Sequence, residues 1–289
     1  MKKLIKPIAK NLAKLYGMLS TLPFRFRSNH ISKPDNVSHE HWVNYLSSQF
    51  NKSGYRVLEL GSRNVTGANL RNKFSNADYV GFDFYAGENV DVVGDAHKLS
   101  SYFANQEKFD LIFSSAVFEH LHMPWVAAIE IQKLLKVGGY VFIETHFSFS
   151  SHERPWHFFQ FSDMGLRALF NEALGFDLVE SGMSNPISGY FAHNADDYLK
   201  HLPVTELYCH SEIFCRKRCD VDVFDWNNVT IDSIVEGTRY PLPKEPPPGV
   251  RKPTGSEETN RVSSHIPETN RETNRVSSHI PNQQQPTLA

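Results

Sequence analysis

The chain has 289 residues, and its 40% apolar content is enough for one sizeable hydrophobic core. A formal net charge of −2 gives no electrostatic indication of nucleic-acid binding, so we expect no nucleic-acid partner. Three cysteines (Cys209, Cys215 and Cys219) argue against a secreted disulfide scaffold. Cys215 and Cys219 also lack the CxxC spacing of a zinc site, so we expect reduced thiols, no metal and a cytoplasmic protein.

Residues 1–34 form a basic amphipathic segment, because every charged residue before Asp35 is Lys or Arg. On a helical wheel of residues 2–19, aliphatic side chains occupy one face and lysines the other. This pattern is typical of a helix that lies in a membrane interface, here at the inner face of a membrane through residues 1–28. Two alternatives stay open: the helix packs on the following domain, or it binds a partner. Lys6, Lys10 and Lys14 interrupt any signal-peptide core, and no apolar run is long enough to span a bilayer.

Residues 35–218 alternate apolar strand-like runs with helix-length connections, which predicts an α/β domain with a doubly wound, Rossmann-like, parallel sheet. A helix is expected over 68–74 and another over 125–135, the second ended by Gly138 and Gly139. The expected strands, in chain order, are 55–60, 79–83, 90–94, 109–113, 140–144, 176–180 and 212–216.

Residues 219–289 form a C-terminal extension that is poor in residues able to build a core. A Pro-rich stretch covers 241–248, and the ten residues 258–267 recur at 272–281, a repeat with a period of 14. Each repeat unit has one Val and one Ile to bury, too little to offset the entropy of ordering the chain. We therefore expect a largely disordered tail, with a docking motif as the alternative.

Three consecutive predicted strands end in a glycine or an acid. The first is followed by Gly61, the second ends at Asp83, and Asp95 follows the third. An acid about 20 residues after such a glycine turn binds the ribose of nucleotides in doubly wound folds, and ligands lie at the carboxyl edge of the sheet. A nicotinamide dehydrogenase would need G-x-G-x-x-G, whereas Arg63 and Val65 interrupt that pattern here.

The segments 57–61, 94–96, 109–121 and 135–143, together with Asp83, resemble the successive motifs of class I S-adenosylmethionine (SAM)-dependent methyltransferases of the small-molecule type. The resemblance covers about residues 50–218, and the segments FDLIFSSAVFEHL and LKVGGYVFI are its most specific parts. It implies a seven-stranded sheet, mostly parallel, with an antiparallel last strand and helices on its flanks. Arg63 and Val65 stand where the family's loop usually has further glycines.

The resemblance also implies SAM as cofactor. Glu59 and Gly61 would border its methionine portion, Asp83 would accept hydrogen bonds from both ribose hydroxyls, and Asp95 would accept one from the adenine amine. The full set of implied cofactor contacts is Glu59, Gly61, Gly67, Asp83, Phe84, Asp95, Ala96, His97 and Ser115.

Histidines are frequent after the fourth and fifth predicted strands, and histidine is the natural base near neutral pH. His146 is the first candidate for a catalytic base, with His152 and His120 as further candidates. The segment 155–161 resembles a stretch of methyltransferases of glycan and secondary-metabolite assembly, which favours a small-molecule or glycan acceptor, methylated at a hydroxyl. The alternatives are a catalytically idle SAM-binding partner module and, less favoured, a nicotinamide-dependent oxidoreductase.

Overall fold

The structure is a computed structural model, and it describes residues 11–12, 14–22, 31–65, 67 and 69–235. The first ten residues of the amphipathic segment lie outside the described residues, as do the Pro-rich stretch and the repeat. Of the segment's described part, residues 14–20 are helical. No helix among the described residues is long and apolar enough to cross a membrane.

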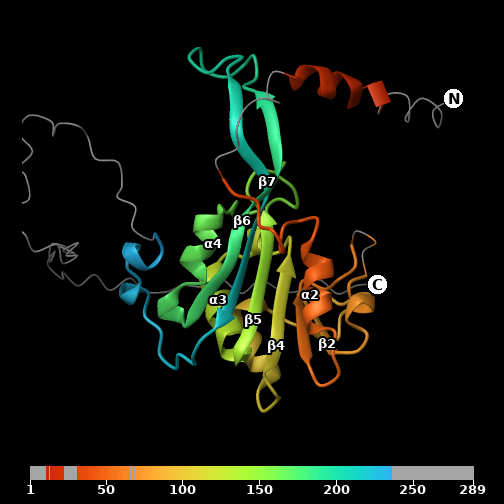
Figure 1. The fold of residues 1–289 in the computed structure, drawn as a ribbon, viewed down its shortest axis with the longest axis vertical. Coiled ribbons are helices and arrows are strands. Elements are labelled where there is room, and N and C mark those ends of the chain that lie inside the picture. Colours follow the sequence, from red (N-terminus) through yellow and green to blue (C-terminus); the bar gives the residue numbers. More distant parts are fainter. Residues whose placement is uncertain (1–10, 13, 23–30, 66, 68, 236–289) are drawn as a thin grey trace, which may run out of the picture. The chain divides into compact units, whose positions relative to one another are not determined.

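A seven-stranded sheet with the order β3-β2-β1-β4-β5-β7-β6 forms the centre of the fold (Figure 1). All neighbouring pairs are parallel except those of β7, which runs antiparallel to both β5 and β6. The predicted fold class is therefore confirmed, including the antiparallel last strand. The strands are β1 (Arg56–Leu60), β2 (Asp78–Asp83), β3 (Val92–Val93), β4 (Phe109–Ser115), β5 (Leu135–His146), β6 (Phe176–Tyr190) and β7 (Pro203–Lys217).

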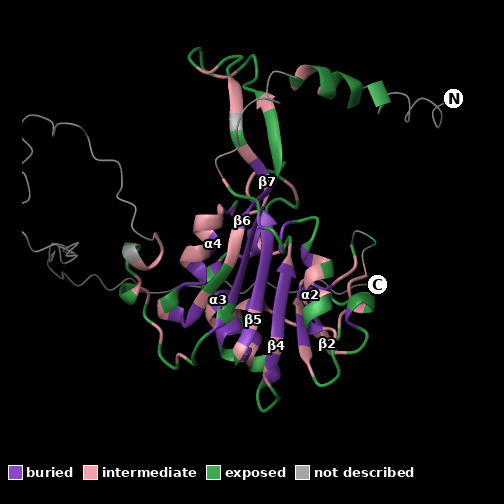
Figure 2. Cartoon of the chain, in the orientation of Figure 1, coloured by how far each residue is buried: buried purple, intermediate pink, exposed green. Residues whose placement is uncertain are grey.

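Helices cover both faces of the sheet. Side chains of successive strand residues point to opposite faces, so each central strand contributes to two hydrophobic cores. On β4, Ile112 belongs to a core cluster shared with helices α3 (Pro124–Leu134) and α4 (Asp163–Leu169). Its neighbours Leu111 and Phe113 belong to a second cluster, shared with α2 (Trp42–Phe50). Figure 2 shows the buried residues concentrated along the central strands.

Short 3-10 helices complete the connections between these elements. They are η2 (Arg71–Phe74), η3 (Ala96–Phe103), η4 (Phe118–His120), η5 (Glu172–Leu174), η6 (Trp226–Asn228) and η7 (Ile231–Ser233).

Several element boundaries differ from the sequence prediction. Only the short η2 forms within the helix expected over 68–74. Helix α3 ends at Leu134 and β5 starts at the next residue, so Gly138 and Gly139 lie inside a strand and do not end the helix. β6 and β7 are each 15 residues long, far beyond the predicted strands. They extend beyond the rest of the sheet as a pair and remain paired as far as Tyr190 and Pro203 (Figure 1). In this extension the two strands supply the hydrogen-bond partners of each other's backbone groups.

Candidate active site

Gly61, Asp83 and Asp95 lie in one row at the carboxyl edge of the sheet. Leu60 pairs with Phe82 and Asp83 pairs with Val93, so the three strands end side by side. The Gly61 N–H donates to the Phe82 carbonyl at 2.8 Å, and the Gly94 N–H donates to the Asp83 carbonyl at 2.9 Å. Two carboxylates and a glycine turn thus share the edge at which doubly wound sheets bind their ligands.

The turn after β1 requires glycine for two reasons. Gly61 has φ +90°, a left-handed conformation that costs side-chain-bearing residues energy. A Cβ atom at this position would also overlap the Val117 side chain. The turn is therefore packed tightly against the segment that follows β4.

Arg63 and Asp83 contact each other across this edge. The Asp83 carboxylate accepts from the Arg63 backbone N–H at 3.3 Å, from its side-chain Nε at 3.4 Å and from the Tyr85 N–H at 2.9 Å. The guanidinium of Arg63 also lies 5.6 Å from the centre of the Tyr85 ring. Arg63 thus engages the oxygens on which the resemblance places the ribose hydroxyls.

Asp95 caps η3 and holds the ring of His97. Its Oδ1 accepts from the His97 N–H at 2.9 Å and lies 2.6 Å from Nδ1 of His97. Burial opposes its ionisation, but these His97 contacts hold the pKa of Asp95 below its usual range. Ala96 is buried beside this pair, whereas Phe84 is 60% exposed and free to cover a ligand.

Glu59 is half-buried on β1, and its carboxylate accepts from the Tyr79 hydroxyl. Burial raises the pKa of Glu59 to about 8, and the neighbouring Asp83 charge adds to this while Arg71 opposes it. In the loop that follows, the Gly67 N–H donates to the Asn64 side chain at 2.8 Å. Ser115, at the end of β4, donates to Glu144 at 2.7 Å.

The three histidines expected as bases come together. The ring of His146, at the end of β5, lies 5.3 Å from that of His152, and the ring of His152 lies 4.9 Å from that of His120. Two further histidines join this group, and neither is among the three expected bases. His157 lies 4.7 Å from His152, and His210 on β7 lies 5.4 Å from His146.

Glu119 is the main residue that sequence reasoning missed. Its Oε1 lies 2.7 Å from Nδ1 of His146 and 4.0 Å from Nε2 of His120, and both Oε1 and Nδ1 of His146 are buried. Thr145 donates to the other carboxylate oxygen at 2.6 Å. Although burial opposes ionisation, the contacts with His146 and Thr145 hold the pKa of Glu119 below its usual range. An acid inside the apolar run 117–121 was the available signal.

Two more carboxylates are buried beside the histidines. Glu144 on β5 and Glu212 on β7 are register partners, 2% and 0% exposed. Oε2 of Glu144 lies 2.8 Å from Nδ1 of His39. Burial raises the pKa of Glu212 to about 8 and lowers that of His210 to about 4, so the His210 imidazole is neutral near pH 7. This end of the sheet therefore combines the neutral imidazole of His210 with buried acids.

The chain belongs to a family of methyltransferases, because a family model described as a methyltransferase domain matches residues 34–180, about half of its length. With the SAM motifs and this fold, the family assignment makes the chain a SAM-dependent methyltransferase with a Rossmann-like domain and SAM as its cofactor. None of the curated proteins compared with the chain matches it.

Several solved structures are similar to the chain. TehB from Haemophilus influenzae is 18% identical, with a TM-score of 0.37 over 60% of this chain and 66% of that one. A SAM-dependent methyltransferase from Archaeoglobus fulgidus is 15% identical, with a TM-score of 0.43 over 62% and 96%. The Burkholderia thailandensis 1,6-didemethyltoxoflavin-N1-methyltransferase is 14% identical, with a TM-score of 0.43 over 61% and 76%. All three scores lie below 0.5, so the family assignment rests on the matched domain.

Proposed function

We propose that this methyltransferase methylates a hydroxyl group of a small-molecule or glycan acceptor, with His146 as the general base. The observation that carries the proposal is the buried contact between Glu119 and Nδ1 of His146. A carboxylate on Nδ1 fixes the ring orientation and the tautomer, so Nε2 presents its lone pair. This is the arrangement that removes a proton from a hydroxyl.

The residues at the sheet edge fit SAM. The Gly61 turn lies at the carboxyl edge of the sheet, and Asp83 and Asp95 offer carboxylates to hydroxyl and amine donors. Glu59, Gly67, Phe84, Ala96, His97 and Ser115 complete the proposed cofactor contacts. When bound, SAM supplies a methyl group on a sulfonium, which is already an activated leaving group.

The order of the strands supports a position of the proposed base on the acceptor side of the cofactor. The strands β2, β4 and β5 end at Asp83, Ser115 and His146, and Gly61 directly follows β1. These four strands are neighbours in the sheet, in the order β2-β1-β4-β5. His146 therefore lies on the acceptor side of the proposed cofactor position. Its Nε2 accepts the hydroxyl proton while the acceptor oxygen forms its bond to the methyl carbon, and the sulfur keeps the electron pair of the broken bond. Positioning and proton removal are the protein's contributions.

The loop 151–162 offers a wall for the acceptor. The backbone N–H groups of Phe158 and Phe159 donate to the Glu119 carbonyl at 2.9 and 3.2 Å. These hydrogen bonds hold the loop next to the proposed base His146 and its carboxylate partner. Trp156 is 60% exposed and Phe158 is 43% exposed. Exposed aromatic rings beside histidines suit a ligand with apolar faces and hydroxyl edges, such as a sugar. His152 and His120 stand beside this wall as proposed polar contacts.

Calorimetry with SAM, S-adenosylhomocysteine and NAD tests the cofactor part of the proposal. Binding of the first two and no binding of NAD is the expected result, and preferential binding of NAD would contradict it. Methyl-labelled SAM, offered with extracts of hydroxylated metabolites, tests the chemistry. Labelled methyl ethers are expected, whereas SAM binding without any transfer would favour the idle partner module.

We also propose that the N-terminal segment binds a membrane surface, which would suit a lipid-linked acceptor in the cytoplasm. In the described part, the apolar side chains of Leu12, Leu15, Tyr16 and Leu19 are each more than half exposed. Such a face, together with lysines, is attracted to anionic lipid. Sedimentation with anionic liposomes, with and without residues 1–28, tests this, and equal sedimentation of the two chains would contradict it.

A further inference from the structure

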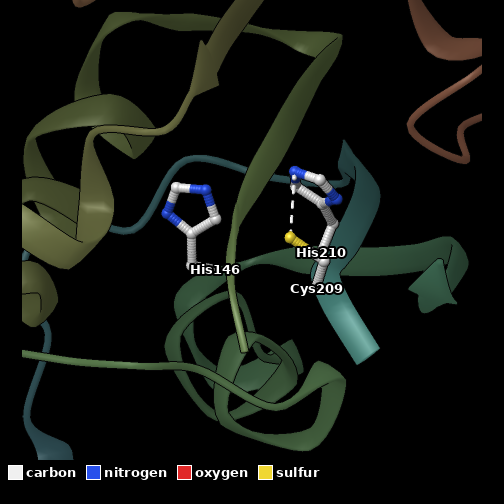
Figure 3. Close-up of side chains that lie close together, drawn as sticks. All are labelled: His146, Cys209 and His210. Carbon is white, nitrogen blue, oxygen red and sulfur yellow. Dashed lines mark hydrogen bonds between the residues drawn. The ribbon is translucent and has the colours of Figure 1, made fainter. Parts of the chain in front are cut away.

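Three potential metal ligands from two strands meet beside the proposed base. His146 comes from β5, and Cys209 and His210 come from β7, which runs antiparallel to it. One ligand atom from each residue lies within 4.8 Å of the others. Figure 3 shows the two imidazoles and the thiol gathered together, with one ring nitrogen of His146 on the side toward His210 and Cys209. The sequence predicted no metal site, because Cys215 and Cys219 lack the CxxC spacing. His146 and Cys209, which the fold brings together, are 63 positions apart in the chain.

The spacing of these atoms suits a tetrahedral zinc ion. Sγ of Cys209 and Nε2 of His210 are 3.7 Å apart. Bond lengths of about 2.3 Å to sulfur and about 2.0 Å to nitrogen place two such ligands about 3.5 Å apart at the tetrahedral angle. The rings of His146 and His210 are tilted by 39° at 5.4 Å, which leaves their nitrogen lone pairs able to converge. A side-chain adjustment of roughly 1 Å would bring all three to bonding distance.

The outer nitrogen of each imidazole already has a partner. Glu119 holds Nδ1 of His146 at 2.7 Å, which is the carboxylate–histidine arrangement that commonly supports zinc ligands. Asn185 lies 3.0 Å from Nδ1 of His210, and an amide can serve either tautomer of the ring by turning. In both residues Nε2 is therefore the nitrogen left for an ion.

The charge of the surroundings also favours a cation. Glu119 and Glu144 are both at most 2% exposed beside the three ligands. Oε2 of Glu144 lies 2.8 Å from Nδ1 of His39. His39 and Glu144 form an alternative ligand set with His210. However, the rings of His39 and His210 are stacked at 4.0 Å and 14°, so their in-plane lone pairs do not meet at one point.

We propose that His146, Cys209 and His210 bind one divalent cation of the zinc class, with the fourth position open. The Cys209 thiol gives its proton to solvent as the sulfur–metal bond forms, and both Nε2 atoms donate their lone pairs. The consequence for catalysis rests on the proposed function: Nε2 of His146 cannot bind the metal and accept a proton at once. Metal binding therefore reversibly inhibits methyl transfer to a hydroxyl.

Cobalt(II) titration of the chelator-treated full chain tests the site without any methyl acceptor. One equivalent is expected to bind, with the visible bands of tetrahedral cobalt and the near-ultraviolet absorption of a cobalt–thiolate bond. Cys209→Ser should abolish the thiolate absorption, and His210→Ala should weaken zinc binding, measured by calorimetry, at least tenfold. Cys219→Ser is the matched control, because this exposed cysteine lies outside the cluster. It should bind like the unchanged chain.

Glu119→Gln keeps all three ligands and should weaken zinc binding by about 10- to 100-fold, the usual effect of losing such a support. SAM calorimetry on the same preparations establishes that each variant is folded. It also separates the two proposals, since SAM binding without metal binding overturns only the metal site. The metal-site proposal would also be overturned if Cys209→Ser left the cobalt spectrum unchanged. Binding of well below one equivalent of cobalt would overturn it too.

Discussion

The Glu119 carboxylate, fully buried, supports His146 from behind, and its replacement tests the proposed base directly. Glu119→Gln removes the charge that orients the imidazole and stabilises its protonated form during proton transfer. We expect kcat of methyl transfer to fall by about 10²-fold, with little change in KM, because general-base catalysis contributes on that order. Initial-rate kinetics with an identified acceptor, in the presence of chelator, measures it.

Unchanged SAM affinity in Glu119→Gln, measured by calorimetry, is the control for folding. A loss of SAM binding in parallel with the rate would mean that Glu119 supports the whole site and not the base. An unchanged kcat would show that His146 does not remove the proton.

Arg63 competes with the ribose for Asp83, since its Nε lies 3.4 Å from the carboxylate. The pair is partly exposed, and such pairs contribute at most about 1 kcal/mol. Arg63→Ala should therefore raise SAM affinity by up to about fivefold in calorimetry. Lys73→Ala, at an exposed position on η2, is the control and should change nothing. Weaker SAM binding by Arg63→Ala would instead make Arg63 a ligand of the cofactor.

Glu59 couples stability to pH, because its folded pKa of about 8 exceeds its ordinary value of 4.5. Between these values the folded chain keeps a proton that the unfolded chain has lost. The free energy of unfolding should therefore fall as pH rises from about 4.5 to about 8. Urea denaturation across this range should show a shallower fall for Glu59→Gln. An identical slope in the two chains would contradict the assignment.

At the scale of elements, the turn between β1 and η2 depends on Gly61. Gly61→Ala would combine the strain of φ +90° with overlap of the Val117 side chain. We expect a loss of about 2 kcal/mol or more in the free energy of unfolding. Gly54→Ala has φ +83° and open space around it, so it carries the strain alone, about 1 kcal/mol.

Urea denaturation of both variants measures the difference. Adding Val117→Ala to Gly61→Ala should recover part of the loss by removing the overlap. Equal losses for the two glycine variants would mean that the packing of Val117 against the turn does not matter.

The sequence predicts the central elements well, because apolar runs such as 57–60 and 109–113 are buried on both faces and read clearly. It fails where tertiary contacts decide. β5 starts at Leu135 because that residue pairs with Phe109, despite the glycines at 138 and 139. β6 and β7 extend beyond their apolar parts because each pairs with the other as far as Tyr190 and Pro203. Pairing of this kind leaves no hydrophobic period in either strand.

The candidate site likewise has one part that the sequence predicts and one part that it does not. Gly61, Asp83 and Asp95 follow strands directly, so the rule that parallel strands end together brings them to one edge. Glu119 and His210 reach His146 only through the packing of η4 and of the antiparallel β7 against β5. Nothing in their sequence spacing shows this. Their proposed roles therefore come from the structure alone.

At the scale of the catalytic domain, one edge of the sheet carries the proposed cofactor, base and metal sites side by side. The order β2-β1-β4-β5-β7 places, in turn, Asp83, Gly61, Ser115, His146 and His210. The proposed sites for cofactor binding, methyl transfer and the acceptor thus lie on neighbouring strands. The central claim is that the β2–β1 end of this edge binds SAM.

Asp83→Asn and Asp78→Asn test that claim on one strand. Asp83 ends β2 at the proposed ribose position, whereas Asp78 begins β2 at the other edge of the sheet, where it pairs with Arg56. Calorimetry with SAM should show at least a tenfold loss of affinity for Asp83→Asn, because charge-assisted hydrogen bonds to both hydroxyls weaken. Asp78→Asn should stay within about twofold of the unchanged chain. Near-normal binding by Asp83→Asn would contradict the account.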